Sequence, residues 1–193
     1  MITFSTNDRA IKELSQALGG SDKKIRQQLK IAVNAVSRKV KSQIAKEIGR
    51  ELATPQKNIK PTIAIAQKAT ATRNPTAIVR QSKTKRIPLR DFGAKQNKTG
   101  TSYKTSKRKG RKHIARAFQG PRPGVVSTKT RGRVFKRKGK ARLPIVQLFG
   151  PSPWGVFIKN GIKKPVVIIA RGELLKQIQR RTRFIKLKQS GAI

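Results

Sequence analysis

Hydrophobic residues recur with helical spacing near the start of the chain. Ile11, Leu14 and Leu18 lie three and four residues apart, which is the spacing of one face of an α-helix. Ser5 or Thr6 can cap this helix, because either hydroxyl accepts a hydrogen bond from a backbone N–H of the first turn. Gly19 and Gly20 follow and predict its end.

A second, much longer pattern predicts a helix that begins near Ser21 or Asp22. Its apolar positions lie almost all four residues apart, at Ile25, Leu29, Ala32, Val36, Val40, Ile44, Ile48 and Leu52. A spacing of four exceeds 3.6 residues per turn, so the apolar stripe drifts slowly around the helix. Such a helix packs over a sheet or against a neighbouring subunit. We favour the interpretation that the stripe is part of the core of the chain rather than a subunit contact. Thr54 and Pro55 then predict a cap and first-turn proline of a short helix.

The pattern changes after residue 60 to short apolar runs typical of strands. Residues 62–66 and 77–80 predict two strands, joined by a turn at residues 73–75. Residues 87–92 are apolar but contain Pro88, which favours an edge strand or the start of a strand.

Apolar content returns in the last third of the chain. Residues 143–149 predict a strand before the Gly-Pro-Ser-Pro turn, and residues 166–170 predict a buried strand or the start of a helix. Residues 173–187 predict a C-terminal helix. Its expected inward residues are Leu174, Leu175, Ile178, Phe184 and Ile185.

These elements predict an α+β fold. An N-terminal helical pair, with its long helix packed on an antiparallel sheet, is followed by a basic hairpin or loop arm and a C-terminal helix. The 193 residues suit a single domain, 1–193. Its expected parts are helices at 1–58, strands at 59–97, the basic arm at 98–142 and a strand and helix part at 143–193.

Charge gives the basic arm its character. The chain has 48 Lys and Arg against 7 Asp and Glu, a formal net charge of +41. Twenty-two of those cations, and no acid, lie between Phe92 and Gly172. Charge of this size repels itself unless anions or partner subunits offset it. A solvated surface does not require so long an acid-free stretch, so we expect contact with a polyanion, most readily nucleic acid.

The expected contacts are to phosphates rather than to bases. The chain is only 5% aromatic, and no zinc-finger, helix-turn-helix or RNA-recognition signature is present. The arm is expected to form short strands held by Tyr103, Phe118 and Phe135, and to be mobile until a partner binds. The candidate nucleic-acid-binding residues are Lys98, Lys104, Lys107, Arg108, Lys109, Arg111, Lys112, Arg131, Arg133, Lys136, Arg137, Lys138, Lys140 and Arg142.

The residues for catalysis or metal binding are scarce. There is no cysteine, the seven acids do not pair at a spacing that indicates a joint site, and His113 stands alone among cations. General acid–base catalysis and divalent-cation sites need such groups close together. We therefore expect no enzyme activity, no catalytic residues, no cofactor and no metal. The longest purely apolar run, residues 166–170, is also far too short to span a membrane, so no membrane partner is expected.

Two aromatic residues are candidates for an interface. Phe149 and Trp154 flank the Gly-Pro-Ser-Pro turn. Tryptophan is enriched at binding hot spots, yet a residue packed in a rigid turn explains Trp154 equally well, and both interpretations stay open.

The ordered blocks of the chain resemble the prophage minor tail protein Z family, the tail completion proteins of lambda-like long-tailed phages. After the helical pair, the resemblance is carried by residues 87–96 (IPLRDFGAKQ), 103–112 (YKTSKRKGRK), 117–118 (AF), 132–137 (GRVFKR) and 143–152 (LPIVQLFGPS). The last block is the most specific, and the match in block order runs over nearly the whole chain.

The resemblance implies a structural protein of the virion at the head-proximal end of the tail, made in the host cytoplasm. It implies other tail and neck proteins as partners, such as the tail terminator and the tape-measure protein, and a homo-oligomeric ring. Combined with the charge, it predicts that the basic arm contacts phage DNA in the channel, or an acidic part of a tail protein. The alternative is a free, basic nucleic-acid-binding protein of ribosomal or chromatin type.

Overall fold

The computed structural model describes residues 2, 8–19, 21–72, 75–120 and 132–190. The chain divides into two compact units. We call Met1–Ile44, Ile63–Gln81 and Gly161–Ile193 the helical unit, and Ala45–Thr62 and Ser82–Asn160 the strand unit. The single domain with four consecutive parts stays a prediction.

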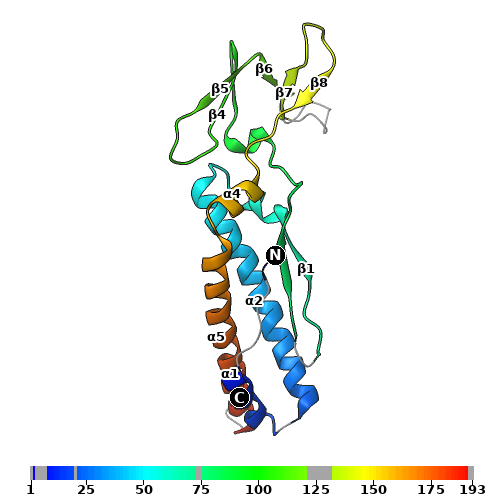
Figure 1. Cartoon of the computed structure of the whole chain (residues 1–193), viewed down its shortest axis with the longest axis vertical. Coiled ribbons are helices and arrows are strands. Elements are labelled where there is room, and N and C mark those ends of the chain that lie inside the picture. The colour runs from blue at the N-terminus through cyan, green and yellow to red at the C-terminus, as the bar shows by residue number, and fades with distance from the viewer. Residues whose placement is uncertain (1, 3–7, 20, 73–74, 121–131, 191–193) are drawn as a thin grey trace. The chain divides into compact units, whose positions relative to one another are not determined.

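The helical unit contains three helices and one hairpin (Figure 1). Helix α1 (Asp8–Ala17) contacts α5 (Lys163–Gln189), and most of α2 (Asp22–Glu51) belongs to the same unit. Lys39 of α2 pairs with Glu173 at 2.5 Å, and Arg181 donates to Gln28 at 3.0 Å. Since residue numbers rise on one helix and fall on the other, α2 and α5 are antiparallel.

The apolar stripe of α2 forms the core of the chain itself. Its eight predicted positions, from Ile25 to Leu52, are all buried. The six positions from Ile25 to Ile44 belong to the helical unit. Buried residues of its other elements include Leu14, Ile63, Val166, Leu174 and Ile178. The interpretation of the stripe as core, rather than as a subunit contact, is therefore confirmed.

The hairpin pairs β1 (Ile63–Gln67) with β2 (Ile78–Gln81) in antiparallel register, with Ile65 opposite Val79. Asn34 of α2 fixes the segment after β1, because its amide both donates to Ala69 O (3.0 Å) and accepts from Ala69 N (2.9 Å). Both predicted strands are confirmed. The cap at Ser5 or Thr6, Gly20, and Arg73 and Asn74 of the predicted turn lie outside the described residues.

The C-terminal helix corrects two predictions. It begins at Lys163, ten residues before the expected start, and includes residues 166–170, so the strand alternative there is wrong. A helix turns residues inward only at every third or fourth position; Val166 and Ala170 are therefore buried while Ile168 is 71% exposed. Phe184, expected to point inward, is 56% exposed.

The strand unit contains short helices and two three-stranded antiparallel sheets. One sheet has the order β3-β4-β5 and the other β6-β7-β8. The strands are β3 (Lys95–Asn97), β4 (Gly100–Tyr103), β5 (Lys112–Ala115), β6 (Ala117–Gln119), β7 (Val134–Arg137) and β8 (Ile145–Gln147). The helices are α3 (Gln56–Ile59), the 3₁₀ turns η1 (Lys60–Thr62) and η2 (Leu89–Phe92), and α4 (Pro153–Lys159).

Three local predictions for this unit need correction. Residues 89–92 form η2 rather than a strand, although Pro88 makes an isolated bridge with Phe149. Thr54 does not cap α3; Pro55 occupies that position, without a side-chain hydrogen bond. Helix α4 begins within the predicted turn, and its proline stands in the first helical turn, where the missing N–H costs nothing.

A small apolar core holds the two sheets. Leu89, Ala117 and Val134 are buried, and Tyr103 and Leu148 pack against them. The Gln96 side chain links the sheets by accepting from Gln119 N at 2.8 Å and donating towards Gly100 O at 3.1 Å. The α+β class predicted from the sequence is confirmed.

Candidate polyanion-binding surface

Two loops of the strand unit carry most of the candidate cations. One joins β4 to β5 and the other joins β7 to β8 (Figure 1). Of the fourteen predicted residues, Arg131 lies outside the described residues, Lys104 is half-buried and the rest are exposed. The expected hairpins are thus present in the described part of the basic arm, and strands β4–β7 within it form sheets.

The β4–β5 loop is fixed to the end of α2. Lys107 N donates to Glu51 O at 3.1 Å, and Ala53 N donates to Thr105 O at 3.0 Å. Leu52 and Ser106 form an antiparallel bridge between these hydrogen bonds. The loop that contains Lys107 is therefore held to the end of α2 by backbone contacts.

Several predicted arginines act within the fold. Arg111 donates to Gly93 O at 2.6 Å and to Ser102 O at 3.0 Å, and such charge-assisted bonds are stronger than neutral ones. Arg108 lies 3.5 Å from the Glu51 carboxylate. A further contact joins Arg133 to Gln147 at 3.1 Å. These guanidinium groups position strands and loops, so they are poorer candidates for binding than the sequence predicts.

The predicted lysines of the basic arm differ from its arginines. Their ammonium groups make no hydrogen bond or ion pair with any residue that the structure describes. This group consists of Lys98, Lys104, Lys107, Lys109, Lys112, Lys136, Lys138 and Lys140. A lysine is a hydrated point charge on a flexible stem, which suits contact with phosphates at no fixed sequence.

Few carboxylates are available to neutralise these lysines. The acids of the strand unit are Glu47, Glu51 and Asp91. Glu47 pairs with Arg50 at 2.7 Å, and Glu51 lies near Arg108. Burial raises the pKa of Asp91, against the opposing effect of the nearby Arg90 and Lys57 charges. The surface therefore keeps a strong positive potential.

Cations outside the predicted list also belong to this unit. Lys95, on β3, is exposed, and its strand pairs with β4 at Ser102. Lys159, at the end of α4, is exposed as well. The absence of acids around both residues is a signal that could have found them, but the predicted bounds of the arm, 98–142, are too narrow to include them.

The two aromatic candidates for an interface differ in burial. Phe149 is 43% exposed. The half-buried Trp154 stacks on Phe157 with ring centroids 5.9 Å apart, and the Lys83 ammonium lies 5.5 Å from its ring centre. These contacts favour the packing interpretation of Trp154, and the interface role of both residues stays a prediction.

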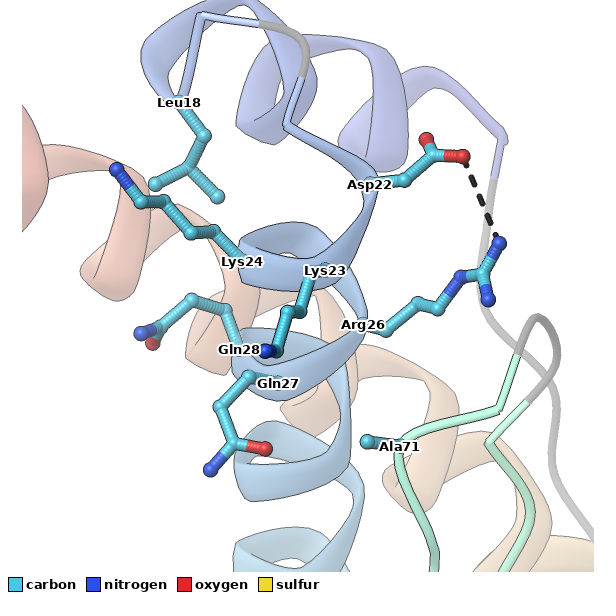
Figure 2. Close-up of a pocket in the computed structure, with 8 residues that line it drawn as sticks. All are labelled: Leu18, Asp22, Lys23, Lys24, Arg26, Gln27, Gln28 and Ala71. Atoms are coloured by element: carbon cyan, nitrogen blue, oxygen red, sulfur yellow. Dashed lines mark hydrogen bonds and ion pairs between the residues drawn. The ribbon is translucent and has the colours of Figure 1, made fainter.

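A hollow of about 910 Å³ lies in the helical unit, at the start of α2 (Figure 2). Arg26 turns towards Asp22, with which it pairs at 3.5 Å, while Lys24 lies on the other side of the helix beside Leu18. Because these cations point apart, they do not converge on one anion.

The described residues offer no cluster of metal ligands. Among them, no three His, Cys, Asp or Glu side chains gather where they could hold a metal ion. His113 lies exposed on β5, with Nε2 3.3 Å from Thr99 Oγ1. None of the described helices is long and apolar enough to cross a membrane.

Comparisons with protein-family models, with curated proteins and with solved structures give no match for this chain. The function is therefore inferred from the surface itself and from the order of sequence blocks.

Proposed function

We propose that this chain is a structural protein of a phage virion, a tail completion or minor tail protein at the head-proximal end of the tail. In this role it forms a ring with copies of itself and contacts the tail terminator and the tape-measure protein. The lysine surface of the strand unit contacts DNA in the channel through phosphates, without sequence specificity. No catalytic step is part of the proposal.

The observation that carries the proposal is the set of unpaired lysines of the basic arm. A folded unit with this excess of cations is stabilised when a polyanion neutralises them, because each phosphate contact releases a condensed counterion. The block order, which resembles that of the tail completion family, then points to DNA at the head–tail junction.

The first experiment measures duplex DNA binding as a function of salt. Neutralising Lys136, Lys138 and Lys140 to Gln removes three cations that make no internal contact. If each contacts one phosphate, the slope of log affinity against log salt falls by about 0.9 per lysine. The matched control neutralises Lys24, Lys176 and Lys186, three exposed lysines of the helical unit, and is expected to keep most of the slope. Equal losses in both variants would remove the assignment of binding to the strand unit.

Loop arginines are unsuitable for this test. From the sequence alone, reversing Lys107, Arg108, Lys109 and Arg111 together should leave folding intact. In the structure, however, Arg111 donates to Gly93 O and Ser102 O, and Arg108 lies near the Glu51 carboxylate. A loss of function in that variant would mix binding with stability. Replacing only lysines separates the two.

The second experiment asks where the protein is found. A tagged chain produced during infection is expected to copurify with phage tails and to be labelled at the head-proximal end in electron micrographs. Copurification with ribosomal subunits or with bulk chromosomal DNA instead would support the free nucleic-acid-binding alternative. If tails fail to assemble with the lysine variant while its DNA affinity is unchanged, the polyanion is an acidic tail protein.

A further inference from the structure

A pocket of about 380 Å³ lies in the strand unit, between the β4–β5 loop and α4. The end of α2, at Glu51 and Leu52, forms part of its wall. The loop side is held by the backbone bridge between Leu52 and Ser106, so this wall of the pocket is formed by backbone contacts within the strand unit.

Three lysines line this pocket. They are Lys109 in the loop, Lys112 on β5 and Lys159 on α4. Lys159 is distant in the chain from the other two. None of the three pairs with a described residue. The pocket also has the Glu51 carboxylate on its wall, but Arg108 lies 3.5 Å from it, which leaves the net charge of the site positive.

Uncharged donors also line the pocket. Thr105, Ser106 and Ser152 are on its wall, and each carries a hydroxyl. The Ser152 oxygen is buried and has no hydrogen-bond partner in the described structure, which is uncommon for a buried polar atom. Since Ser152 lines the pocket, its unpartnered hydroxyl is a candidate donor to an oxygen atom held there.

We propose that this pocket binds one phosphate group, with Lys109, Lys112 and Lys159 as charge partners and Ser152 as a hydrogen-bond donor. The inference rests on the proposed function and deepens it, since it assigns a defined phosphate position within a surface that otherwise binds diffusely. Phosphate oxygens are strong, negatively charged acceptors, which matches three cations and several hydroxyls.

Gly155 allows a test that does not remove any lysine. It lines the pocket on α4, and an added Cβ would meet no atom within 4 Å. A Gly155→Glu substitution therefore fits sterically and favours the helix, while it adds a carboxylate at the pocket. Gly172→Glu is the matched control, because Gly172 lies exposed in α5 with equally open space around its Cα.

The first arm titrates the isotope-labelled full chain with inorganic pyrophosphate and follows backbone amide shifts by NMR. In the wild type, the amides of Ser106, Ser152 and Gly155 are expected to shift together and to saturate with one dissociation constant. Gly155→Glu should weaken that constant at least about tenfold, equivalent to losing one charge-assisted contact. Lys159→Gln should weaken it several-fold, and Gly172→Glu less than about twofold. Equal effects of the two glutamates, or shifts spread evenly over all basic loops, would overturn the pocket.

The second arm identifies the source of the phosphate by the salt slope of duplex DNA binding. A slope that falls by about one in Gly155→Glu, but not in Gly172→Glu, assigns the pocket to a nucleic-acid phosphate. An unchanged slope together with pyrophosphate binding assigns it to a free phosphate compound, and leaves the DNA surface on the other lysines intact. If Lys136, Lys138 and Lys140 prove irrelevant to DNA while pyrophosphate still binds, the proposed function fails and the pocket stands.

Discussion

The two units use charged and apolar residues in different ways. In the helical unit, a buried aliphatic stripe from α2 is shared with α1, α5 and the β1–β2 hairpin, and carboxylates such as Asp22 and Glu173 pair with cations. The strand unit has a smaller apolar core around Leu89, Ala117 and Val134. Its sheets are fixed by hydrogen bonds and close backbone approaches, and the lysines of its two basic loops remain unpaired. The first unit is stabilised by burial, whereas the second leaves much of its positive charge exposed and unpaired.

The largest expected effect tests burial in the helical unit. Ile178 of α5 is 1% exposed, and Ile168 of the same helix is 71% exposed. Ile178→Ala should lower the free energy of unfolding by about 3 kcal/mol, through lost apolar burial and the cavity left behind. Ile168→Ala should change it by less than about 0.5 kcal/mol. Urea unfolding followed by circular dichroism measures both, and similar values for the two would contradict the assignment of the buried face.

The corresponding test in the strand unit uses Gly150, whose backbone lies close to the Phe92 ring. A Cβ on Gly150 would overlap carbons of the fully buried Phe92 ring. Gly150→Ala should therefore destabilise the fold by about 2 kcal/mol through overpacking. The Gly139→Ala control, where an added Cβ meets nothing within 4 Å, should stay within about 0.5 kcal/mol.

The overpacking also predicts a rescue. Phe92→Leu removes part of the ring that the new methyl meets, so the double variant should lose less stability than the sum of the two single variants. Additive losses, measured by the same urea unfolding, would show that Gly150 matters for a reason other than contact with Phe92.

A middle-sized effect concerns the polar contact that fixes the hairpin of the helical unit. Asn34→Ala removes both hydrogen bonds to the buried Ala69 backbone and should cost about 1.5 kcal/mol, because those backbone groups lose their partners. The Asn58→Ala control in the strand unit loses only one long contact of 3.5 Å to Thr54. Hydrogen exchange at the Ala69 amide should accelerate in the first variant only; unchanged exchange there would show that the backbone finds other partners.

The same difference between the units explains which elements are predictable from the sequence. Helix α2 and the β1–β2 hairpin follow from periodic apolar positions, since burial selects one residue type at regular spacing. Strand β3, in contrast, is exposed at all three residues, so no alternation indicates it. Its partner β4 pairs on its other side with β5. There a Cβ on Gly100 would overlap the backbone oxygen of Ile114, a close approach that no spacing rule predicts.

The candidate site was predictable in kind but not in detail. The acid-free stretch indicates a basic surface, because the net charge of a segment is counted from the sequence and does not depend on how the segment folds. The division between structural arginines and unpaired lysines depends on contacts such as Arg111 with Gly93, eighteen residues away. Likewise, Lys159 joins Lys109 and Lys112 only because α4 and the β4–β5 loop line one pocket. Long-range contacts of this kind leave no periodic pattern in the chain.

The smallest expected effects are those of two aspartate-to-asparagine substitutions, which change stability in opposite directions in the two units. Asp22 lies in the first turn of α2, where its negative charge interacts favourably with the positive end of the helix dipole. Asp22→Asn should therefore lower stability at pH 7 by about 0.5 kcal/mol.

Burial raises the pKa of Asp91 above its ordinary value, so the native state binds a proton more readily than the unfolded state. Its contribution to stability is greatest below the ordinary pKa of 3.8 and falls as the pH rises through the raised native value.

Asp91→Asn removes that pH dependence. The stability of the variant relative to the wild type should increase as the pH rises from about 3 to 7. Urea unfolding of both asparagine variants at several pH values checks this. A relative stability of Asp91→Asn that falls over the same range would mean that the Arg90 and Lys57 charges outweigh burial, and that this acid stabilises the strand unit as Asp22 stabilises the helical one.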